Sequence, residues 1–407
     1  MTALALIVSL SVVGCDEPEP VEEPEAEPAE QEDDDDDDSD VGGTTLDTEY
    51  QDIELTEVAG PFEHPWAVAF LPDDRKLVTE RPGRLQLVED GEATDIGGLP
   101  DIAVQNQGGL LDVVAHPEYD DNGWIYFTFS KPEDGSNETA TALARAQLDE
   151  DESELTDLEE LFVQDRYSSP GRHYGSRLAW TNDGYLLMSI GDRGTDPPRA
   201  QDTGDHAGSL LRLEEDGSVP DDNPFVDDDD GLDEIYTYGN RNIQGLAVDP
   251  ETDEIWATEH GPRGGDLLHR LEGGNNYGWP KVTQGLNYAD QGPFPDFEAR
   301  SMDDVEDPFH EFFPTMAPSG LAVVTTDQFR NWEGNLLAGG LRAERIRRMV
   351  VEDDAVLGAG EYEPLHQEEL LLQEVGRIRD VREGPEGDIW VLTDAADGTL
   401  YRVSPAG

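Results

Sequence analysis

Cysteine is almost absent from the chain: Cys15 is the single one among 407 residues. One thiol cannot form a disulfide within the chain, and no second cysteine completes a CxxC metal or redox motif. Disulfide-stabilised folds and cysteine-ligated metal sites are therefore excluded.

Positive charge is also scarce. The chain has 26 Lys and Arg residues against 94 Asp and Glu residues, for a formal net charge of -68, and Lys76, Lys131 and Lys281 are the only lysines. Residues 16–40 hold 16 acidic residues and no basic one, so removing those 16 charges from -68 still leaves -52. This charge argues against nucleic-acid binding, because the phosphate backbone favours the opposite sign. High acid content with little lysine indicates adaptation to salt, which screens self-repulsion.

Long hydrophobic runs are missing as well. Residues 2–14 are apolar but too short to span a bilayer as a mature helix. They lead into Val12-Val13-Gly14-Cys15, which resembles the cleavage box of bacterial lipoprotein signals, although a basic n-region is lacking. We expect residues 1–15 to be a lipoprotein-type signal peptide that exports the protein to the periplasm or cell envelope, with a lipid anchor on Cys15 as its only membrane contact. An ordinary secretory signal is the alternative.

Residues 16–46 contain mainly Glu, Pro and Asp, including the six-residue block Asp33–Asp38. This composition has almost nothing to bury and repels itself, so we expect a disordered, extended linker. Calcium binding by the Asp block is an alternative that we consider weaker than a solvated tether.

From residue 47 to 407 one pattern recurs six times: an apolar strand, a turn with Pro, Asp or Gly, and a second apolar strand. The copies begin at Trp66, Leu111, Leu178, Leu246, Leu321 and Asp380. No long segment has the 3.6-residue period of a helix, and a β-sandwich would not need the same hairpin six times. We therefore predict an all-β fold, a six-bladed β-propeller, whose blade loops surround a central channel.

The hairpin within residues 171–194 carries ionisable groups at both ends. His173 precedes its first strand, and Asp192 follows its second. Strand ends can hold a base and its orienting acid at a fixed separation. The alternative is structural: His173 caps a turn, and Asp192 binds backbone amides.

Polar side chains stand at the corresponding ends of other repeats. They are Gln107, Arg241, Asn242, Gln244, Glu259, His260, Arg342, Arg377, Arg379 and Asp394. Four arginines directed at one cavity in an acidic protein suggest an anionic, polycarboxylate ligand. Pairing of these arginines with local acids such as Asp380 and Glu383 is the alternative.

Several motifs resemble those of the soluble PQQ-dependent glucose and aldose sugar dehydrogenases, over residues 63–402 and in the same order. They are Gln107-Gly-Gly-Leu-Leu, His173-x-Gly-x-Arg-Leu with Ile190-Gly-Asp-Arg-Gly, Tyr238-Gly-Asn-Arg-Asn, Glu259-His-Gly-Pro, Gly274-Asn-Asn-Tyr-Gly-Trp-Pro, Ala317-Pro-Ser-Gly and Arg377-Ile-Arg-Asp-Val. The family fold is also a six-bladed propeller.

The resemblance implies an enzyme that oxidises an aldose to its lactone. His173 would act as the general base, and Asp192 would orient and charge it. Arg241 and Asn242 would lie beside the quinone of PQQ, with Gln107 near the reacting centre.

It also implies a cofactor and a metal. Arg377 and Arg379 would hold the PQQ carboxylates, and Asp394 would be a cofactor-site acid. The backbone carbonyls of Gly261 and Pro262 would ligate an active-site calcium ion. The resemblance is compatible with a quinone, a dye or a cytochrome as electron acceptor, and with a monomer or a homodimer.

The chain departs from the family pattern in three places. Arg342 replaces a cofactor-binding lysine, which keeps the charge but alters its geometry. Phe313 stands where the glucose enzymes have Trp, and the segment after Gly194 differs too, so we expect a sugar preference other than glucose alone. Asp266 and Tyr277 match a second calcium site, but Leu267 replaces an acidic ligand there.

Two other functions compete with this one. A metal-dependent propeller lactonase would need a Glu/Asn/Asp cage on the channel axis, where this sequence has arginines. A non-catalytic propeller that binds glycans or proteins would not need His173 and Asp192.

Overall fold

The computed structural model describes residues 43–72, 74–149, 153–169, 171–352, 355–356, 368–373 and 375–407. The predicted signal peptide and the predicted linker up to residue 42 lie outside these residues. Strand β1 (Thr44–Asp47) is already part of a sheet, so the folded unit begins a few residues before the predicted boundary at 47. Within the described residues, no helix has the length and apolar character needed to cross a membrane.

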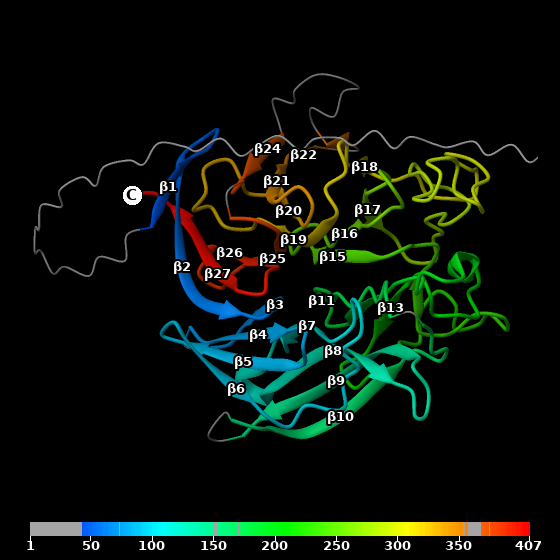
Figure 1. Cartoon of the computed structure of the whole chain (residues 1–407), viewed down its shortest axis with the longest axis horizontal. Coiled ribbons are helices and arrows are strands. Elements are labelled where there is room, and N and C mark those ends of the chain that lie inside the picture. The colour runs from blue at the N-terminus through cyan, green and yellow to red at the C-terminus, as the bar shows by residue number, and fades with distance from the viewer. Residues whose placement is uncertain are drawn as a thin grey trace, which may run out of the picture. The chain divides into compact units, whose positions relative to one another are not determined.

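The strands form six antiparallel blades (Figure 1). Blade one is β3 (Pro65–Phe70), β4 (Lys76–Glu80), β5 (Arg84–Glu89) and β6 (Glu92–Ile96), and blade two is β7 (Leu110–Ala115), β8 (Trp124–Pro132), β9 (Thr139–Leu148) and β10 (Leu155–Val163). Blade three is β11 (Leu178–Trp180), β12 (Leu186–Ile190), β13 (Ser209–Leu213) and β14 (Ile235–Thr237), and blade four is β15 (Ile243–Val248), β16 (Ile255–Glu259), β17 (Leu267–Leu271) and β18 (His310–Glu311). Blade five is β19 (Pro318–Val323), β20 (Leu336–Gly340), β21 (Arg345–Met349) and β24 (Glu368–Leu371). Blade six is β25 (Ile378–Glu383), β26 (Ile389–Thr393), β27 (Gly398–Pro405), β2 (Asp52–Phe62) and β1. Between or beside these strands lie helix α1 (Tyr119–Asn122), a 3-10 helix (Pro197–Gln201) and the hairpin β22 (Val351–Glu352) with β23 (Ala355–Val356).

Blade six combines strands from both ends of the described chain, and Figure 1 shows β2 beside β27. The innermost strands contact one another in the order β3, β7, β11, β15, β19, β25 and back to β3. The ring is therefore closed, and the predicted six-bladed propeller is confirmed.

The core is divided into hydrophobic clusters, one at each boundary between neighbouring blades. Strand β12 shows how one strand serves two of them. Leu186, Met188 and Ile190 pack toward blade two, whereas Leu187 packs toward blade four. Because side chains alternate along a strand and both faces are covered, the strand consists almost entirely of apolar residues.

Side-chain hydroxyl groups connect neighbouring blades at the channel. The inner strands of neighbouring blades belong to separate sheets and share no backbone hydrogen-bond ladder. Thr79 accepts a hydrogen bond from the Ala67 N–H at 3.0 Å, and it donates to the Leu111 carbonyl of blade two at 2.6 Å. Thr128 and Ser189 repeat this pair of bonds in the next two blades. In blades one and two, the backbone N–H that donates to the hydroxyl lies in a β-bulge of the first strand. The bulge bends that strand at the channel.

Candidate active site

A cavity of about 530 Å³ lies at the end of the channel where first strands begin and second strands finish. All six blades contribute to its wall. The lining residues include His64, Arg81, Gln107, Tyr174, Asn242, His260, Ala317, Leu341, Arg377, Arg379 and Asp394. Five residues predicted to bind the cofactor therefore share one wall: Gln107, Asn242, Arg377, Arg379 and Asp394.

His173 and Asp192 are both buried and lie in direct contact. The Nδ1 of His173 lies 2.6 Å from Oδ1 of Asp192, whose other oxygen accepts a bond from the Trp279 indole at 2.8 Å. His173 has a left-handed backbone with φ of 51°. A Cβ at Gly191 would lie 2.2 Å from the His173 carbonyl oxygen, so only glycine permits this approach. Asp192 also accepts the Gly194 backbone N–H at 2.8 Å. The structural alternative, in which Asp192 binds backbone amides, is therefore correct for this one bond.

Burial and the Arg241 guanidinium favour the neutral imidazole. Burial, then the Arg241 guanidinium, lower the pKa of His173 below its usual value, although Asp192 raises it. Burial opposes ionisation of Asp192, but His173 and Arg241 outweigh burial and hold the pKa of this carboxyl below its usual value. An ionised Asp192 can only accept, so Nδ1 carries the proton and Nε2 keeps a lone pair that can accept a hydrogen.

Arg241 faces that lone pair. Its Nη2 lies 3.3 Å from His173 Nε2, and its Nη1 donates to the His260 carbonyl at 2.9 Å. The Glu259 carboxylate accepts the Arg241 backbone N–H at 2.9 Å and thereby fixes the start of β15. The guanidinium also lies 5.3 Å from the centre of the Trp279 ring. The structure therefore brings together the three residues predicted to be catalytic, namely His173, Asp192 and Arg241.

Two of the predicted cofactor residues hold the loop that carries His173. Gln107 Oε1 accepts the His173 N–H at 2.8 Å, and Asn242 Oδ1 accepts the Gly175 N–H at 3.0 Å. Both bonds use the side-chain carbonyl oxygen, which leaves each amide NH₂ as a donor on the cavity side.

Arg377 and Arg379 share a single carboxylate. Asp394 Oδ2 accepts from Arg377 at 3.0 Å and from Arg379 at 2.8 Å, and its Oδ1 lies 3.2 Å from His64 Nδ1. Burial works against ionisation of Asp394, but Arg379, Arg377 and His64 hold the pKa of this carboxyl well below its usual range. The alternative that these arginines pair with local acids is therefore correct in part. Arg377 and Arg379 pair with Asp394, but neither pairs with Asp380 or Glu383.

Two guanidinium groups against one carboxylate leave an excess positive charge on this wall. Arg379 Nε is buried and has no hydrogen-bond partner among the described residues. A buried donor without a partner is costly, but an atom this deeply buried does not face a ligand in the cavity. The excess charge of the two guanidinium groups is what suits an anionic ligand such as the carboxylates of PQQ.

Arg342 does not reach the wall. Its side chain is exposed, and its backbone N–H donates to the Met316 carbonyl at 3.0 Å. The preceding residue, Leu341, lines the cavity and accepts a bond from Arg377 at 3.1 Å. Arg342 therefore lies beside the cavity mouth, apart from the other predicted cofactor residues.

The predicted calcium ligands Gly261 and Pro262 follow β16 in a tight loop, closed by a bond from Gly265 N–H to the Pro262 carbonyl at 3.0 Å. A Cβ at Gly261 would lie 1.8 Å from the Gly265 oxygen, so glycine is required. Backbone carbonyl oxygens are ligands that Ca²⁺ accepts. No group of three or more His, Cys, Asp or Glu in the described part of the chain could hold a metal ion. The loop offers two backbone carbonyls of a type that Ca²⁺ accepts, one of which already accepts the Gly265 N–H, so a calcium ion there would need further oxygens from the cofactor or water.

The resemblance assigned Asp266 and Tyr277 to a second calcium site. In the structure, the two side chains make hydrogen bonds to different residues. The Asp266 carboxylate accepts the N–H groups of Gly261, Met316 and Ala317, at 3.2, 3.0 and 2.8 Å, and the hydroxyl of Thr315. The Tyr277 hydroxyl accepts from Glu272 N–H at 2.8 Å and donates to the Arg270 carbonyl at 3.1 Å. Asp266 thus connects blade four to the loop that enters blade five, and the structure does not bring the pair together.

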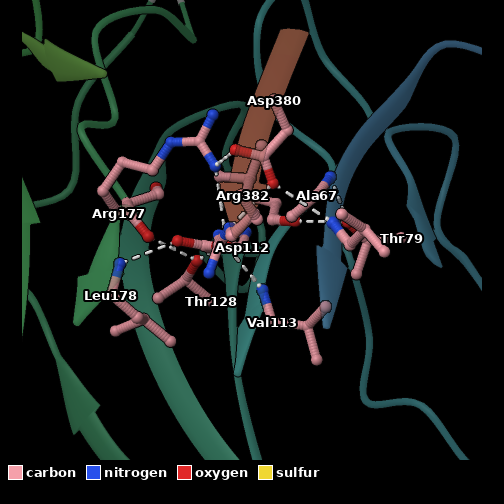
Figure 2. A network of polar contacts seen from close by, with 12 residues as sticks. Ala67, Thr79, Asp112, Val113, Thr128, Arg177, Leu178, Asp380 and Arg382 are labelled. Carbon is pink, nitrogen blue, oxygen red and sulfur yellow. Dashed lines mark hydrogen bonds and ion pairs between the residues drawn. The ribbon is translucent and has the colours of Figure 1, made fainter. Parts of the chain in front are cut away.

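A buried ion cluster lies behind the cavity wall (Figure 2). Arg177 donates to Asp380 at 2.8 Å, and Arg382 donates to Asp380 at 3.0 Å and to Asp112 at 2.5 Å. Arg177 also donates to the backbone carbonyls of Gln244 at 2.6 Å and of Arg379 at 3.0 Å. Its guanidinium lies 4.1 Å from the centre of the Trp66 ring. Since Gln244, Arg379 and Trp66 line the cavity, Arg177 supports this part of the wall from behind.

Four residues that belong to the site or support it were not assigned to it from the sequence: His64, Arg81, Arg177 and Trp279. His64 precedes β3, and Arg81 follows β4. They correspond to His173 and Asp192 in blade three, so the strand-end pattern applied to blade one identifies them. Trp279 belongs to the long segment between β17 and β18, and no local signal assigned it to this site.

Comparisons with known proteins identify the family of the chain. A family model described as Glucose / Sorbosone dehydrogenase matches residues 62–402. The chain is 38% identical over 346 residues to aldose sugar dehydrogenase YliI of Escherichia coli (strain K12), over 84% of this chain and 90% of that protein. The crystal structure of the soluble aldose sugar dehydrogenase from Escherichia coli, in its apo-form, has a TM-score of 0.81 and 36% identity, covering 87% of this chain and 100% of that one. The PQQ-bound aldose sugar dehydrogenase of Streptomyces coelicolor has a TM-score of 0.69 and 26% identity, covering 86% of this chain and 98% of that one.

Proposed function

The chain belongs to the glucose/sorbosone dehydrogenase family, and on that basis we propose that it oxidises aldose sugars at the anomeric carbon to lactones, with PQQ as the cofactor and Ca²⁺ as its metal ion. The observation that carries the proposal is the neutral His173, held by Asp192 with Nε2 directed toward Arg241. This base stands beside a cavity wall with an excess of guanidinium groups.

His173 takes the proton from the anomeric hydroxyl through Nε2. The imidazolium that forms is stabilised by Asp192, which accepts from Nδ1 at 2.6 Å. The hydrogen on the anomeric carbon leaves as hydride while the carbon–oxygen double bond of the lactone forms, so two electrons and one proton are accounted for. When bound, PQQ supplies the two-electron acceptor. Arg241 provides a fixed cation where negative charge develops.

Other residues hold the cofactor in this proposal. Arg377 and Arg379 bind its carboxylates. Asn242 and Gln107 offer amide donors from the cavity wall. The carbonyls of Gly261 and Pro262 bind the calcium ion.

The lactonase alternative needs a cage of carboxylates and amides around a metal ion on the channel axis. The strand ends carry arginines there, and Asp394 is already bound by two of them. This arrangement favours an anionic cofactor over a metal cage.

The test is reconstitution of the purified protein with PQQ and Ca²⁺, followed by dye reduction with a panel of aldoses. We expect sugar-dependent dye reduction that requires both additions. A protein that neither binds PQQ nor reduces dye with any aldose would instead fit the non-catalytic propeller.

A further inference from the structure

Four arginines that lack a carboxylate partner lie on loops at the cavity end of the blades. Many other arginines of the described residues pair with acids, as Arg84 does with Glu80 at 2.7 Å and Arg166 with Asp205 at 2.7 Å, whereas the exposed Arg300 and Arg330 form no such pair either. Within the described part of the chain, Arg81, Arg172, Arg263 and Arg342 form no ion pair with a carboxylate. In a sequence with 94 acidic residues against 26 basic ones, these four arginines at one end of the blades are available to an anionic ligand.

Each of these arginines is placed by a loop of the cavity end. Arg81 lines the cavity and donates to the Asn106 carbonyl. Arg172 directly precedes His173, is exposed and donates to the Gly194 carbonyl. Both guanidinium groups bind neutral carbonyl oxygens, so neither is held in an ion pair with a carboxylate.

Arg263 and Arg342 occupy loops that follow second strands. Arg263 comes after Pro262, and its backbone N–H donates to the Leu286 carbonyl at 3.1 Å while its side chain is exposed. Arg342 comes after Leu341, which lines the cavity. Exposed acids occur on nearby loops, such as Asp196 and Glu344, but neither forms an ion pair with these arginines.

The unpaired charges have a chemical preference. A guanidinium group binds carboxylate or phosphate through two parallel hydrogen bonds. Positive charges beside an entrance also attract anions and accelerate their association. In the proposed function, the inner arginines Arg377 and Arg379 serve the cofactor, so the outer four remain available for the other reactant.

We propose that the mouth selects anionic aldoses, meaning sugars that carry a carboxylate or phosphate group away from the anomeric carbon. This inference rests on the proposed function and deepens it. The reaction is unchanged: hydride leaves the anomeric carbon for PQQ, the anomeric hydroxyl proton passes to His173 Nε2, and the anionic group stays intact. The arginines bind that group and orient the sugar.

The experiment compares D-glucuronate, D-glucose 6-phosphate and D-glucose with the full-length holoenzyme, at NaCl concentrations from about 20 mM to about 500 mM. We expect kcat/KM to be roughly tenfold higher for an anionic sugar than for glucose at low salt, and this advantage to shrink as salt screens the arginines. The carboxylate and phosphate arms identify which anion fits better. Glucose measured in the same buffers corrects for any effect of salt on folding.

A pair of variants tests the residues. Arg263→Gln should lower the ratio of anionic-sugar to glucose kcat/KM several-fold, because it removes an entrance charge. Arg330→Gln is the matched control, since Arg330 is an exposed arginine in the turn between β19 and β20, at the other end of the blades. It should leave the ratio unchanged.

The outcomes separate the two proposals. Turnover of glucose with no advantage for either anionic sugar would overturn the substrate inference alone. Arg263→Gln could instead slow the association of PQQ and leave the ratio of anionic-sugar to glucose kcat/KM unchanged. That result would also overturn the substrate inference, because the arginines would then serve entry of the cofactor. Absence of turnover with every sugar would contradict the proposed function, and this inference with it.

Discussion

His173 is held from three directions, and each contact has a separate consequence. Asp192 fixes the tautomer through Nδ1, Gln107 fixes the backbone N–H, and Arg241 faces Nε2. The left-handed backbone of His173 has an energetic cost for a residue with a side chain. The close approach of Gly191 and the bond to Gln107 maintain that conformation. Strained residues of this kind occur at functional sites, which agrees with a catalytic role for this imidazole.

Replacement of the base should separate chemistry from binding. We expect His173→Ala to bind PQQ with unchanged affinity and to lose about 10²- to 10⁴-fold in kcat, because a positioned base is removed. Stopped-flow dye reduction and fluorescence titration with PQQ measure the two quantities. Unchanged kcat in this variant would remove His173 from the mechanism.

The ionisation of His173 can be tested in the protein without cofactor. Its pKa should lie below the usual value of about 6.5, because burial and Arg241 disfavour the imidazolium. Asp192 favours the imidazolium, so Asp192→Asn should lower the pKa of His173 further. An NMR titration of the histidine ring protons measures both values. A higher pKa in the Asp192→Asn protein would show that the charges act in the opposite sense.

The ends of strands carry most of the site, which is why much of it was predictable. First strands are preceded by Gln107, His173 and Asn242, and second strands are followed by Asp192 and Asp394. The alternation of apolar residues reveals these strands locally, and the propeller topology then places their ends together.

Residues that act across blades were not predictable in this way. Arg177 reaches Asp380 from 203 positions away, and Trp279 reaches Asp192 from 87 positions away. Nothing in the local pattern around either residue specifies such a partner, because the contact exists only after the ring closes. Arg342 shows the opposite error: a strand-end position predicted it to reach the cavity, but its side chain is exposed.

The cluster behind the wall gives a matched pair of variants. Arg177 and Arg382 bind the same two carboxylates, but Arg177 also donates to the carbonyls of Gln244 and Arg379. We expect Arg177→Lys and Arg382→Lys each to lower the free energy of unfolding by about 1–3 kcal/mol. Only Arg177→Lys should also weaken PQQ binding, by roughly tenfold, because it releases the strand that carries Arg379. Denaturant unfolding and PQQ titration measure the two effects. Equal PQQ affinities in both variants would mean that Arg177 is only structural.

Closure of the ring depends on strands from both ends of the described chain. In β2, Ile53, Ala59 and Phe62 are buried against blades five, six and one. Ile53 and Phe62 each contribute about 2 kcal/mol of hydrophobic stabilisation, and Ala59 contributes less. The last blade therefore needs residues that are far upstream of it in the sequence.

Two truncations test this dependence. Removal of residues 1–41 should leave the melting temperature unchanged, because the compact unit that holds all six blades spans Gly42–Gly407. Removal of residues 1–57 also takes β1 and half of β2, and it should lower the melting temperature by more than about 10 °C or prevent folding. Calorimetry of the two proteins makes the comparison. Equal melting temperatures would show that β2 does not close the ring.

Export and anchoring belong to the whole molecule as well, and we propose that Cys15 carries a lipid. In a bacterial host, the unmodified chain should then sediment with membranes, and Cys15→Ala should appear in the soluble fraction of the periplasm. Cytoplasmic retention of both proteins would contradict the export proposal.

The central claim is that His173 and the arginine-rich wall form one redox site around PQQ. Anaerobic mixing of an aldose with the PQQ- and Ca²⁺-loaded protein, with the absorbance spectrum of the cofactor recorded, tests it without any external acceptor. We predict stoichiometric reduction of the bound cofactor by the wild-type protein, and the same final spectrum reached at least about 100-fold more slowly by His173→Ala. Bound cofactor that stays oxidised in the wild-type protein with every aldose would contradict the claim.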